Sequence, residues 1–195
     1  MKLYKCTKTG GKSIYAKGFE YFLPKGKRPG KWMPEVKELI ECESGYHVAQ
    51  CRQLIEWLDD EIYLVEGRGE HVRYDNKQAF SQIRFVKKFD TWNERTQRLF
   101  AADCAEHVLK HFITHYPDDD RPAKVIQAAR DFANGLISCD AARSAAISVA
   151  SSVAWAARRA AGVDKTIEWQ WQTKRLFEYL DGKRGRKQCQ VRCRT

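Results

Sequence analysis

The sequence predicts an α+β protein with a small mixed α/β unit over residues 1–90, an antiparallel four-helix unit over 91–182 and a basic flexible tail over 183–195. Three observations predict this arrangement. The first half holds short, aromatic-bearing segments separated by glycine and proline. The second half has apolar residues at the helical period and clear helix-ending residues. The last segment has no apolar period and carries six cations and no acid.

The first 90 residues are expected to form strands around one helix. The helix follows Ser44-Gly45 and runs from His47 to Leu58, because apolar residues recur there at the 3.6-residue period. Alternation of polar and apolar residues predicts the strands, since successive side chains of a strand point to opposite faces. The strand candidates are residues 2–7, 18–23, 36–42, 61–66 and 80–89, and the last is expected to bury Ser81, Ile83, Phe85, Lys87 and Phe89.

Residues 91–182 contain the start and stop signals of four helices. Thr91 and Glu94 have the spacing of a capping box, and the helix that they open ends before Pro117. Asp120-Arg-Pro122 starts a second helix, which Gly135 follows. A third, alanine-rich helix is expected from Ser138 to Gly162, and a fourth from Asp164 to Leu180. The short connections predict antiparallel neighbours.

Composition and charge bound the function. Aromatic residues make up 12% of the chain, which argues against disorder. No apolar run reaches the length of a membrane span and no secretory signal stands at the start, so the expected compartment is the cytoplasm, that of the host cell if a phage encodes the chain. Seven cysteines, an odd number without a CxxC pair, are not the pattern of a disulfide framework or a structural zinc site.

The net charge of +10 is concentrated in two places. Residues 1–36 carry nine Lys and Arg against two Glu, whereas residues 91–182 carry twelve of each sign. Cations near an aromatic side chain can hold phosphate and stack on a base. The candidate binding residues for nucleic acid are therefore Lys25, Lys27, Arg28, Lys31 and Trp32 in a loop, and Lys183, Arg184, Arg186, Lys187, Arg192 and Arg194 in the tail.

Two further groups are candidates for metal or cation sites. His107, His111 and His115 recur at every fourth position, so two neighbours share a helix face, but nothing in the sequence selects the remaining ligands that a metal needs. Asp118, Asp119 and Asp120 have no partner cluster at calcium-loop spacing and suit a turn and a helix cap. No metal and no cofactor is predicted, and the question of metal on the histidine face stays open.

An enzymatic alternative rests on a resemblance. The order of a strand at residues 3–6, Gly45-Tyr46-His47, a helix and a strand at 61–66 is similar to ADP-ribosyltransferase-like folds. The resemblance implies an NAD-using enzyme with His47 and, by position, Glu70 as catalytic residues. No Ser-Thr-Ser is present, and Glu41-Cys-Glu43 precedes the Gly-Tyr-His instead of following it. The sequence leans against an enzyme.

A second resemblance covers more of the chain, about residues 40–182. It rests on Cys42-Glu-Ser-Gly-Tyr-His47, Glu61-Ile-Tyr-Leu-Val-Glu-Gly-Arg-Gly-Glu70, Trp92-Asn-Glu-Arg-Thr96, Asp103-Cys-Ala-Glu106, Tyr116-Pro-Asp-Asp-Asp-Arg-Pro122 and Trp169-Gln-Trp-Gln-Thr-Lys-Arg175. These stretches resemble uncharacterised phage and bacterial proteins whose helical half is an immunity-protein-like module. The resemblance implies a bacterial or phage origin and a role in conflict between genetic elements, and it supplies no catalytic residues.

The resulting prediction is a non-enzymatic interaction protein that binds and inhibits or neutralises a macromolecular target. It would act as an anti-defence inhibitor of the anti-CRISPR kind or as an immunity protein, with a protein as the expected partner. The alternatives are the NAD-using enzyme and a sequence-independent nucleic-acid binder. No membrane partner is expected, and the oligomeric state is left open.

Overall fold

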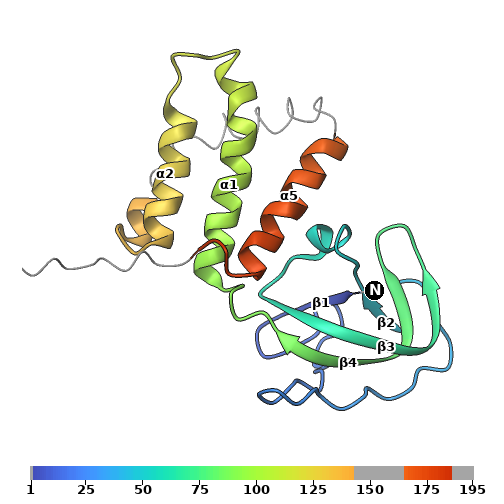
Figure 1. Ribbon diagram of the computed structural model, residues 1–195. Coiled ribbons are helices and arrows are strands. Elements are labelled where there is room, and N and C mark those ends of the chain that lie inside the picture. Colours follow the sequence, from blue (N-terminus) through green and yellow to red (C-terminus); the bar gives the residue numbers. More distant parts are fainter. Residues whose placement is uncertain (1, 143–164, 186–195) are drawn as a thin grey trace, which may run out of the picture. The chain divides into compact units, whose positions relative to one another are not determined.

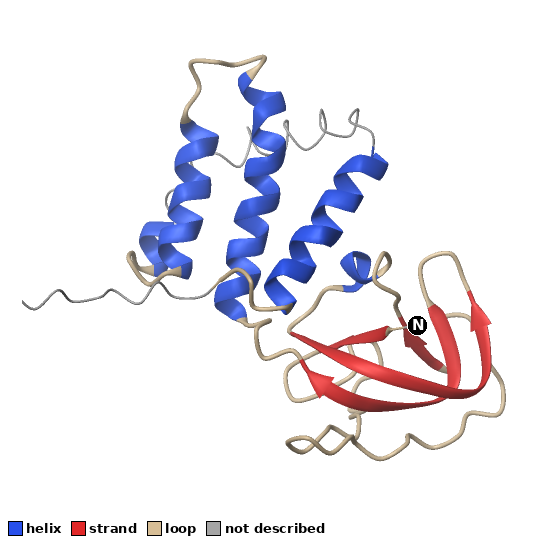
Figure 2. Ribbon diagram, in the orientation of Figure 1, coloured by secondary structure: helices blue, strands red, loops and turns tan. Residues whose placement is uncertain are grey.

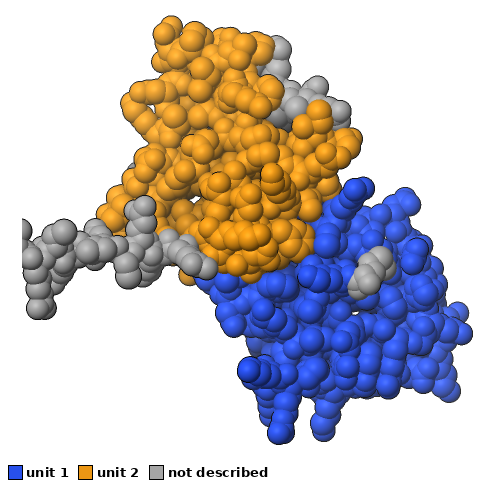
Figure 3. Space-filling view, in the orientation of Figure 1, with its two compact units in different colours: residues 1–93 blue, residues 94–195 orange. Residues whose placement is uncertain are grey.

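The computed structural model describes residues 2–142 and 165–185. The chain divides into two compact units, Met1–Asn93 and Glu94–Thr195, which Figure 3 shows in different colours. Figure 1 labels the strands of the first unit and the helices of the second. Within the described part of the chain, no helix has the length and apolar character needed to cross a membrane.

The first unit is built on a four-stranded antiparallel sheet in the order β1-β3-β4-β2, drawn as red arrows in Figure 2. Its strands are β1 (Leu3–Thr7), β2 (Tyr46–Val48), β3 (Glu61–Arg73) and β4 (Gln78–Lys88). The sheet curls into a half-barrel, and its two edge strands meet where Tyr4 and Ala49 exchange two backbone hydrogen bonds of 2.8 Å. Shifts of register in the β3–β4 ladder at Leu64/Val65 and Arg68/His71 are irregularities of the kind that bend a strand.

The core of this unit lies inside the curl. Tyr63 and Val65 of β3 and Ile83 and Phe85 of β4 are at most 3% exposed, because alternate residues of both strands point inward. The prediction of a buried face on β4 is confirmed for Ser81, Ile83 and Phe85, whereas Lys87 is exposed.

An irregular segment covers the open edge of β4. The amides of Gly30, Met33 and Val36 donate hydrogen bonds of 2.7–3.0 Å to the carbonyls of Phe85, Ile83 and Ser81. The chain approaches itself closely here, since a Cβ on Gly30 would lie 1.9 Å from the carbonyl oxygen of Phe22. The edge is thereby protected from pairing with another chain.

The predicted helix at residues 47–58 is wrong. Tyr46 and Val48 are buried on one side of a short strand that pairs with β4, and only Leu54–Trp57 forms a 3-10 helix, η1. The strand candidates at 18–23 and 36–42 are also wrong, because neither segment forms a strand: they contribute the isolated bridges Lys12↔Glu20 and Ile40↔Ser44 and the hydrogen bond from Val36 to Ser81. The strands at 2–7, 61–66 and 80–89 are confirmed as β1, β3 and β4.

In the second unit, the described residues form α1 (Glu94–Ile113), α2 (Arg121–Ala133) and α5 (Lys165–Leu180). The predicted start of α2 is confirmed, with Asp120 at the N-cap and Pro122 in the first turn. Gly135 and Gly182 follow helix ends with φ of 72° and 67°, a left-handed conformation that favours glycine. Helix α1 begins at Glu94, two residues later than a capping box on Thr91 requires.

The predicted antiparallel four-helix unit is wrong. The protein is a mixed α/β chain in which a four-stranded antiparallel half-barrel precedes the helices. In Figure 1, α2 and α5 both run opposite to α1, and therefore in the same direction as each other. Only α1 and α2 are joined by a short described connection, so the argument from loop length holds for that pair alone. Most of the predicted helix at 138–162 lies outside the described residues; 139–142 are helical.

Candidate functional site

The first unit contains a cavity of about 580 Å³ beside the meeting point of its two edge strands. We call it the β1–β2 hollow. Its lining includes residues 4–6 of β1, residues 42–49 leading into and through β2, residues 13–16 of the first loop, and the side chains of Trp57 and Lys77. Ligand pockets typically enclose roughly 300–1,000 Å³, so the hollow is large enough for a small molecule.

Lys5 brings a positive charge into the hollow from the middle of β1. Its Nζ donates a 2.7 Å hydrogen bond to the backbone carbonyl of His47 and lies 5.5 Å from the ring centre of Tyr21. Burial lowers the pKa of Lys5 to about 8. The ion pairs found among the described residues do not include Lys5, so no carboxylate balances this cation.

His47 and Lys77 form the polar end of the hollow. Burial, followed by the charges of Lys5 and Lys77, lowers the pKa of His47 to about 4, so the imidazole is neutral at pH 7. Its Nε2 accepts a 3.3 Å hydrogen bond from the amide of Cys42, which places the ring proton on Nδ1. Lys77 is 6% exposed; its Nζ donates to the Sγ of Cys42 at 2.9 Å and pairs with Glu41 at 3.1 Å.

Aromatic rings supply much of the remaining wall. The Tyr15 and Trp57 rings meet edge to face at 6.4 Å, and the Phe19 and Tyr21 rings do so at 5.1 Å. Tyr15 is 78% exposed and Phe19 37%, which places large apolar surface in contact with solvent beside the hollow. Cys42 adopts φ of 64°, a strained conformation for a residue with a side chain, and such strain is concentrated at functional sites.

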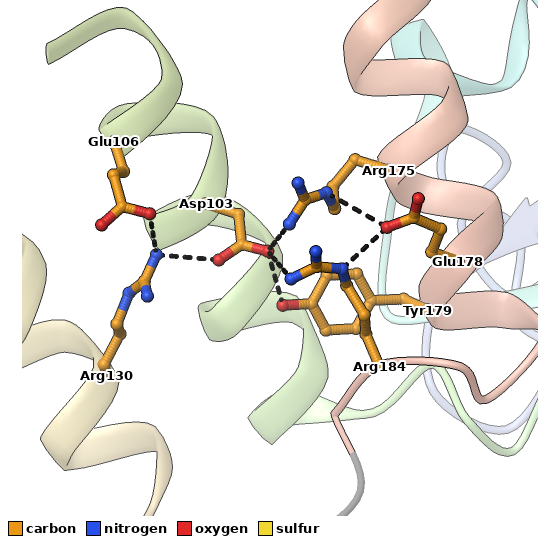
Figure 4. A network of polar contacts seen from close by, with 7 residues as sticks. All are labelled: Asp103, Glu106, Arg130, Arg175, Glu178, Tyr179 and Arg184. Atoms are coloured by element: carbon orange, nitrogen blue, oxygen red, sulfur yellow. Dashed lines mark hydrogen bonds and ion pairs between the residues drawn. The ribbon is translucent and has the colours of Figure 1, made fainter. Parts of the chain in front are cut away.

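The second unit is organised around the carboxylate of Asp103, which is 7% exposed (Figure 4). Arg130 of α2 donates to one oxygen at 2.8 Å, and Arg175 and Tyr179 of α5 donate to the other at 2.7 and 3.0 Å. Arg184 lies 3.6 Å from the second oxygen. Burial and the adjacent carboxylate raise the pKa of Tyr179, so its hydroxyl stays protonated and donates. A single residue of α1 therefore ties α2 and α5 to it.

A second polar connection links α1 and α5. His107 Nδ1 lies 2.7 Å from Glu168, and its ring stacks on Trp171 with centres 3.8 Å apart. Arg175 lies over the same indole, 4.7 Å from its centre. Trp171 thus packs against α1 and Arg175 within the unit, although in the sequence pattern it lies on a different helix face from Trp169 and Leu176. Ile167 is 61% exposed.

The histidine row does not converge on one point. His107 is held by Glu168, and His115 Nδ1 lies 2.9 Å from the carbonyl of His111. Over residues 2–142 and 165–185, no group of three or more His, Cys, Asp or Glu side chains could hold a metal ion. Asp119 accepts a 3.1 Å hydrogen bond from the amide of Arg121, in keeping with a turn role. Asp120 stands at the N-cap position of α2 and pairs with Lys124, but its side chain makes no cap hydrogen bond.

The structure separates the two residues of the enzymatic alternative. His47 lines the β1–β2 hollow, but Glu70 is exposed at the irregularity of β3 and is not among the residues that line it. The helix that the ADP-ribosyltransferase-like order requires after His47 is absent from the described first unit, as η1 has only four residues. An NAD-using activity stays an untested prediction.

The basic loop is exposed, and Trp32 has charged neighbours. Lys25 and Arg28 exchange backbone hydrogen bonds across a tight turn, and Lys27 and Lys31 are exposed beside it. The Trp32 ring is 4.2 Å from the guanidinium of Arg68 and 4.9 Å from that of Arg84. Two cations thus already contact the ring that was expected to stack on a base.

The described start of the tail serves the helical unit. Lys183 pairs with Asp181 at 3.1 Å, and Arg184 pairs with Glu178 at 2.7 Å as well as approaching Asp103. The other candidate tail residues, Arg186, Lys187, Arg192 and Arg194, lie outside the described residues.

Sequence reasoning missed the residues at the centre of both sites. Lys5 stands between the buried Tyr4 and Cys6 in a strand. Lysine is rarely found at such positions unless it has a specific partner, and this is the signal that could have marked it. Asp103 is buried in the middle of α1, and its partners come from α2 and α5. The local sequence around Asp103 carries no signal that predicts these distant partners.

Comparison with known proteins gives a family match that covers part of the helical region. Residues 87–165, less than half of the chain, match the family described as Imm-5 like putative immunity protein. This match supports the immunity-protein-like module expected from the sequence. Neither the search of curated proteins nor that of solved structures gave a significant match.

Proposed function

We propose that the protein is an immunity-type protein that binds a macromolecular target through its helical unit and neutralises it. The match of residues 87–165 to an immunity-protein family carries this proposal, because it spans all of α1 and α2. A protein partner follows from that family, since an immunity protein acts by binding what it protects against.

The Asp103 network supports a binding role. It fixes α2 and α5 on α1 through charged hydrogen bonds at low exposure, so the helices hold one arrangement before a partner arrives. A surface ordered in advance loses less conformational entropy on binding and so retains more of its contact energy.

The target that fits best is a protein effector used in conflict between bacteria and their genetic elements. If the chain comes from a phage, the corresponding target is a defence nuclease, which the protein would inhibit in the manner of an anti-CRISPR protein. The support for both forms is the immunity-type match, together with a chain rich in exposed cations at residues 25–31 that could approach the nucleic acid held by a nuclease.

The exposed apolar end of α1 is the surface to test. Ile113, the last residue of α1, is 44% exposed, and Tyr116, three residues later in the segment that follows the helix, is 43% exposed. Aromatic and aliphatic side chains at the centre of an interface commonly provide most of the binding energy. Ile113→Asp should therefore weaken capture of the partner. Val72→Asp, which changes a 39% exposed side chain in the first unit, is the matched control.

A nucleic-acid role is a second candidate, favoured by one observation. The exposed cations of the loop precede Trp32 in the sequence, and the guanidinium groups of Arg68 and Arg84 lie over the Trp32 ring, so all of these positive charges are near one another. Affinity from such a patch would fall steeply with salt concentration and would not depend on sequence. Nuclease treatment during capture separates this candidate from a protein partner.

A further inference from the structure

The β1–β2 hollow has the properties of a small-molecule site, and the immunity-type proposal, which concerns the other unit, does not use it. Its walls are formed within the first unit from segments that are far apart in the sequence, such as Lys5, Trp57 and Lys77. Two features decide what it could bind: a cation that lacks a carboxylate, and rings that face the space or its rim.

The cation is the stronger feature. Among the described residues, Lys5 donates one hydrogen bond, to the carbonyl of His47, although an ammonium group has three protons to donate. Removing a charge from water is costly unless an opposite charge compensates it. Lys77 adds a second cation to the lining, which also includes the exposed Glu43. Burial, followed by the charges of Lys5 and Lys77, lowers the pKa of His47 and keeps it neutral. An anionic group placed near Lys5 would supply the missing opposite charge.

The rings define the rest of the ligand. Tyr15, Phe19 and Tyr21 line the hollow together with Trp57, and two of them remain in contact with solvent. Aromatic side chains stack on flat, polarisable rings and gain free energy when such a ring displaces water from them. A purely aliphatic anion would leave these faces exposed.

We propose that the β1–β2 hollow binds a small aromatic anion, with its phosphate or carboxylate held by Lys5 and its ring between the aromatic walls. Lys77 contributes long-range attraction while it stays paired with Glu41. The mononucleotides and the aromatic carboxylates share this chemistry, and a cavity of about 580 Å³ accommodates either.

The test is calorimetric titration of the full chain with four probes. Adenosine 5′-monophosphate and indole-3-acetate each combine a ring with an anion, whereas adenosine lacks the anion and ribose 5-phosphate lacks the ring. At least one of the two aromatic anions should bind about tenfold or more tightly than the two fragments, as expected when a charge-assisted hydrogen bond and ring burial act together. Preference for one of the two anions identifies phosphate or carboxylate as the group recognised.

Three variants locate the binding. Lys5→Met keeps the length of the side chain and should lower the affinity for the anion about tenfold or more. Lys17 is exposed and lies outside the lining, so Lys17→Met should leave the affinity unchanged. Tyr15→Ala removes a side chain that is 78% exposed, so the fold is retained and only the contribution of the ring is lost.

The proposal is overturned if neither aromatic anion binds the native chain at millimolar concentration, or if adenosine binds as tightly as its monophosphate and indole-3-acetate does not bind. Equal weakening by Lys5→Met and Lys17→Met would also overturn it, because it would show general charge attraction in place of a site. None of these results bears on Ile113, so the immunity-type proposal is tested separately.

Discussion

Gln78 is a buried side chain whose polar atoms lack partners among the described residues. It is 1% exposed, and neither its Oε1 nor its Nε2 makes a hydrogen bond. A buried polar group without a partner costs roughly 1–3 kcal/mol, so Gln78→Leu should leave the free energy of unfolding unchanged or raise it by about 1 kcal/mol. Urea denaturation followed by intrinsic fluorescence measures this change.

Gln82 provides the control for that experiment. Its Oε1 accepts a hydrogen bond from Arg68 and its Nε2 donates one to Met33. Gln82→Leu removes both bonds and should lower the free energy of unfolding by roughly 1 kcal/mol. If Gln78→Leu were the more damaging of the two substitutions, Gln78 would have a bonding role that the structure does not show.

Glu61 makes the first unit sensitive to acid. Burial alone would raise the pKa of its carboxyl group, but hydrogen bonds from Lys88, Tyr63 and the amides of Gly10 and Gly11 outweigh burial and lower it. A lowered folded-state pKa contributes stability that is present above the unfolded value, near 4.5, and is lost as the pH falls through the folded value. The native chain should therefore lose stability below about pH 4.5.

The Glu61→Gln variant tests this dependence. It should be less stable than the native chain at pH 7 by about 1–3 kcal/mol, because hydrogen bonds to a charged group are lost, and the difference should shrink toward pH 3. Glu20→Gln, at an exposed position, is expected to change neither quantity. A constant difference between Glu61→Gln and the native chain across this pH range would contradict the account.

At the scale of secondary-structure elements, Asp103 should control whether α2 and α5 stay on α1. Asp103→Asn keeps the shape of the side chain but leaves Arg130 and Arg175 without the charge they surround. Removing one partner of a buried ion pair typically lowers the free energy of unfolding by about 3–5 kcal/mol. Denaturation followed by circular dichroism at 222 nm should show a loss of this size.

Asp131→Asn is the matched change on α2. Asp131 accepts a hydrogen bond from Gln127 one turn away at an exposed place, and such pairs contribute about 0.5 kcal/mol or less. If Asp103→Asn were as mild as Asp131→Asn, the network in Figure 4 would not hold the helices together.

The cover on the β4 edge depends on Gly30. A Cβ at this position would overlap the carbonyl oxygen of Phe22, which is backbone and cannot rotate away. Gly30→Ala should displace residues 30–36. Their amides would then lose the hydrogen bonds that they donate to Phe85, Ile83 and Ser81, and would become exposed to solvent. Hydrogen exchange should become faster at Met33 and Val36, and unchanged protection there would contradict the predicted role of this glycine.

Elements with a clear local pattern could be predicted from the sequence, including the short strand β1, whereas the strand β2 could not. Strands β3 and β4 and helix α2 carry clear alternation or cap signals, and all three are present. Residues 47–58 carry a helical period, yet the pairing of Tyr46–Val48 with β4 overrides it, because sheet hydrogen bonds and burial of two side chains outweigh a weak local preference. Local periodicity carries no information about strand pairing between segments that are distant in the sequence.

The sites were predictable only in part for the same reason. The sequence marks His47 as a candidate, and it does line the hollow, but Lys5 and Lys77 reach the hollow from β1 and from the turn before β4. The histidine row is visible as a sequence pattern, whereas its actual partners, Glu168 and Trp171, come from α5. What a side chain meets across the fold is set by packing, which one sequence does not specify.

At the scale of the whole molecule, the two units have different chemistry. The first holds a hollow whose lining includes two lysines and several aromatic rings, and the second is a set of helices joined by a buried carboxylate. Residues 91–182 carry equal numbers of cations and acids, while the excess positive charge lies at 1–36 and 183–195. Binding through the helices should therefore depend weakly on salt, and binding through the loop and tail strongly.

Salt dependence of the captured complex is accordingly a direct prediction. A protein partner held by the helical unit should remain bound when the salt concentration is raised from about 50 to 200 mM, a change that weakens phosphate-dominated binding by orders of magnitude. Elution of the partner over this range would place the binding on the basic segments.

The central claim, that the helical unit neutralises a protein target, is tested most directly by capture of the tagged full chain from a nuclease-treated bacterial lysate, followed by assay of the captured partner. The account predicts one stoichiometric protein whose activity the chain suppresses, lost with Ile113→Asp and retained with Val72→Asp. Recovery only of material that nuclease removes, or of a partner whose activity the chain leaves unchanged, would contradict it.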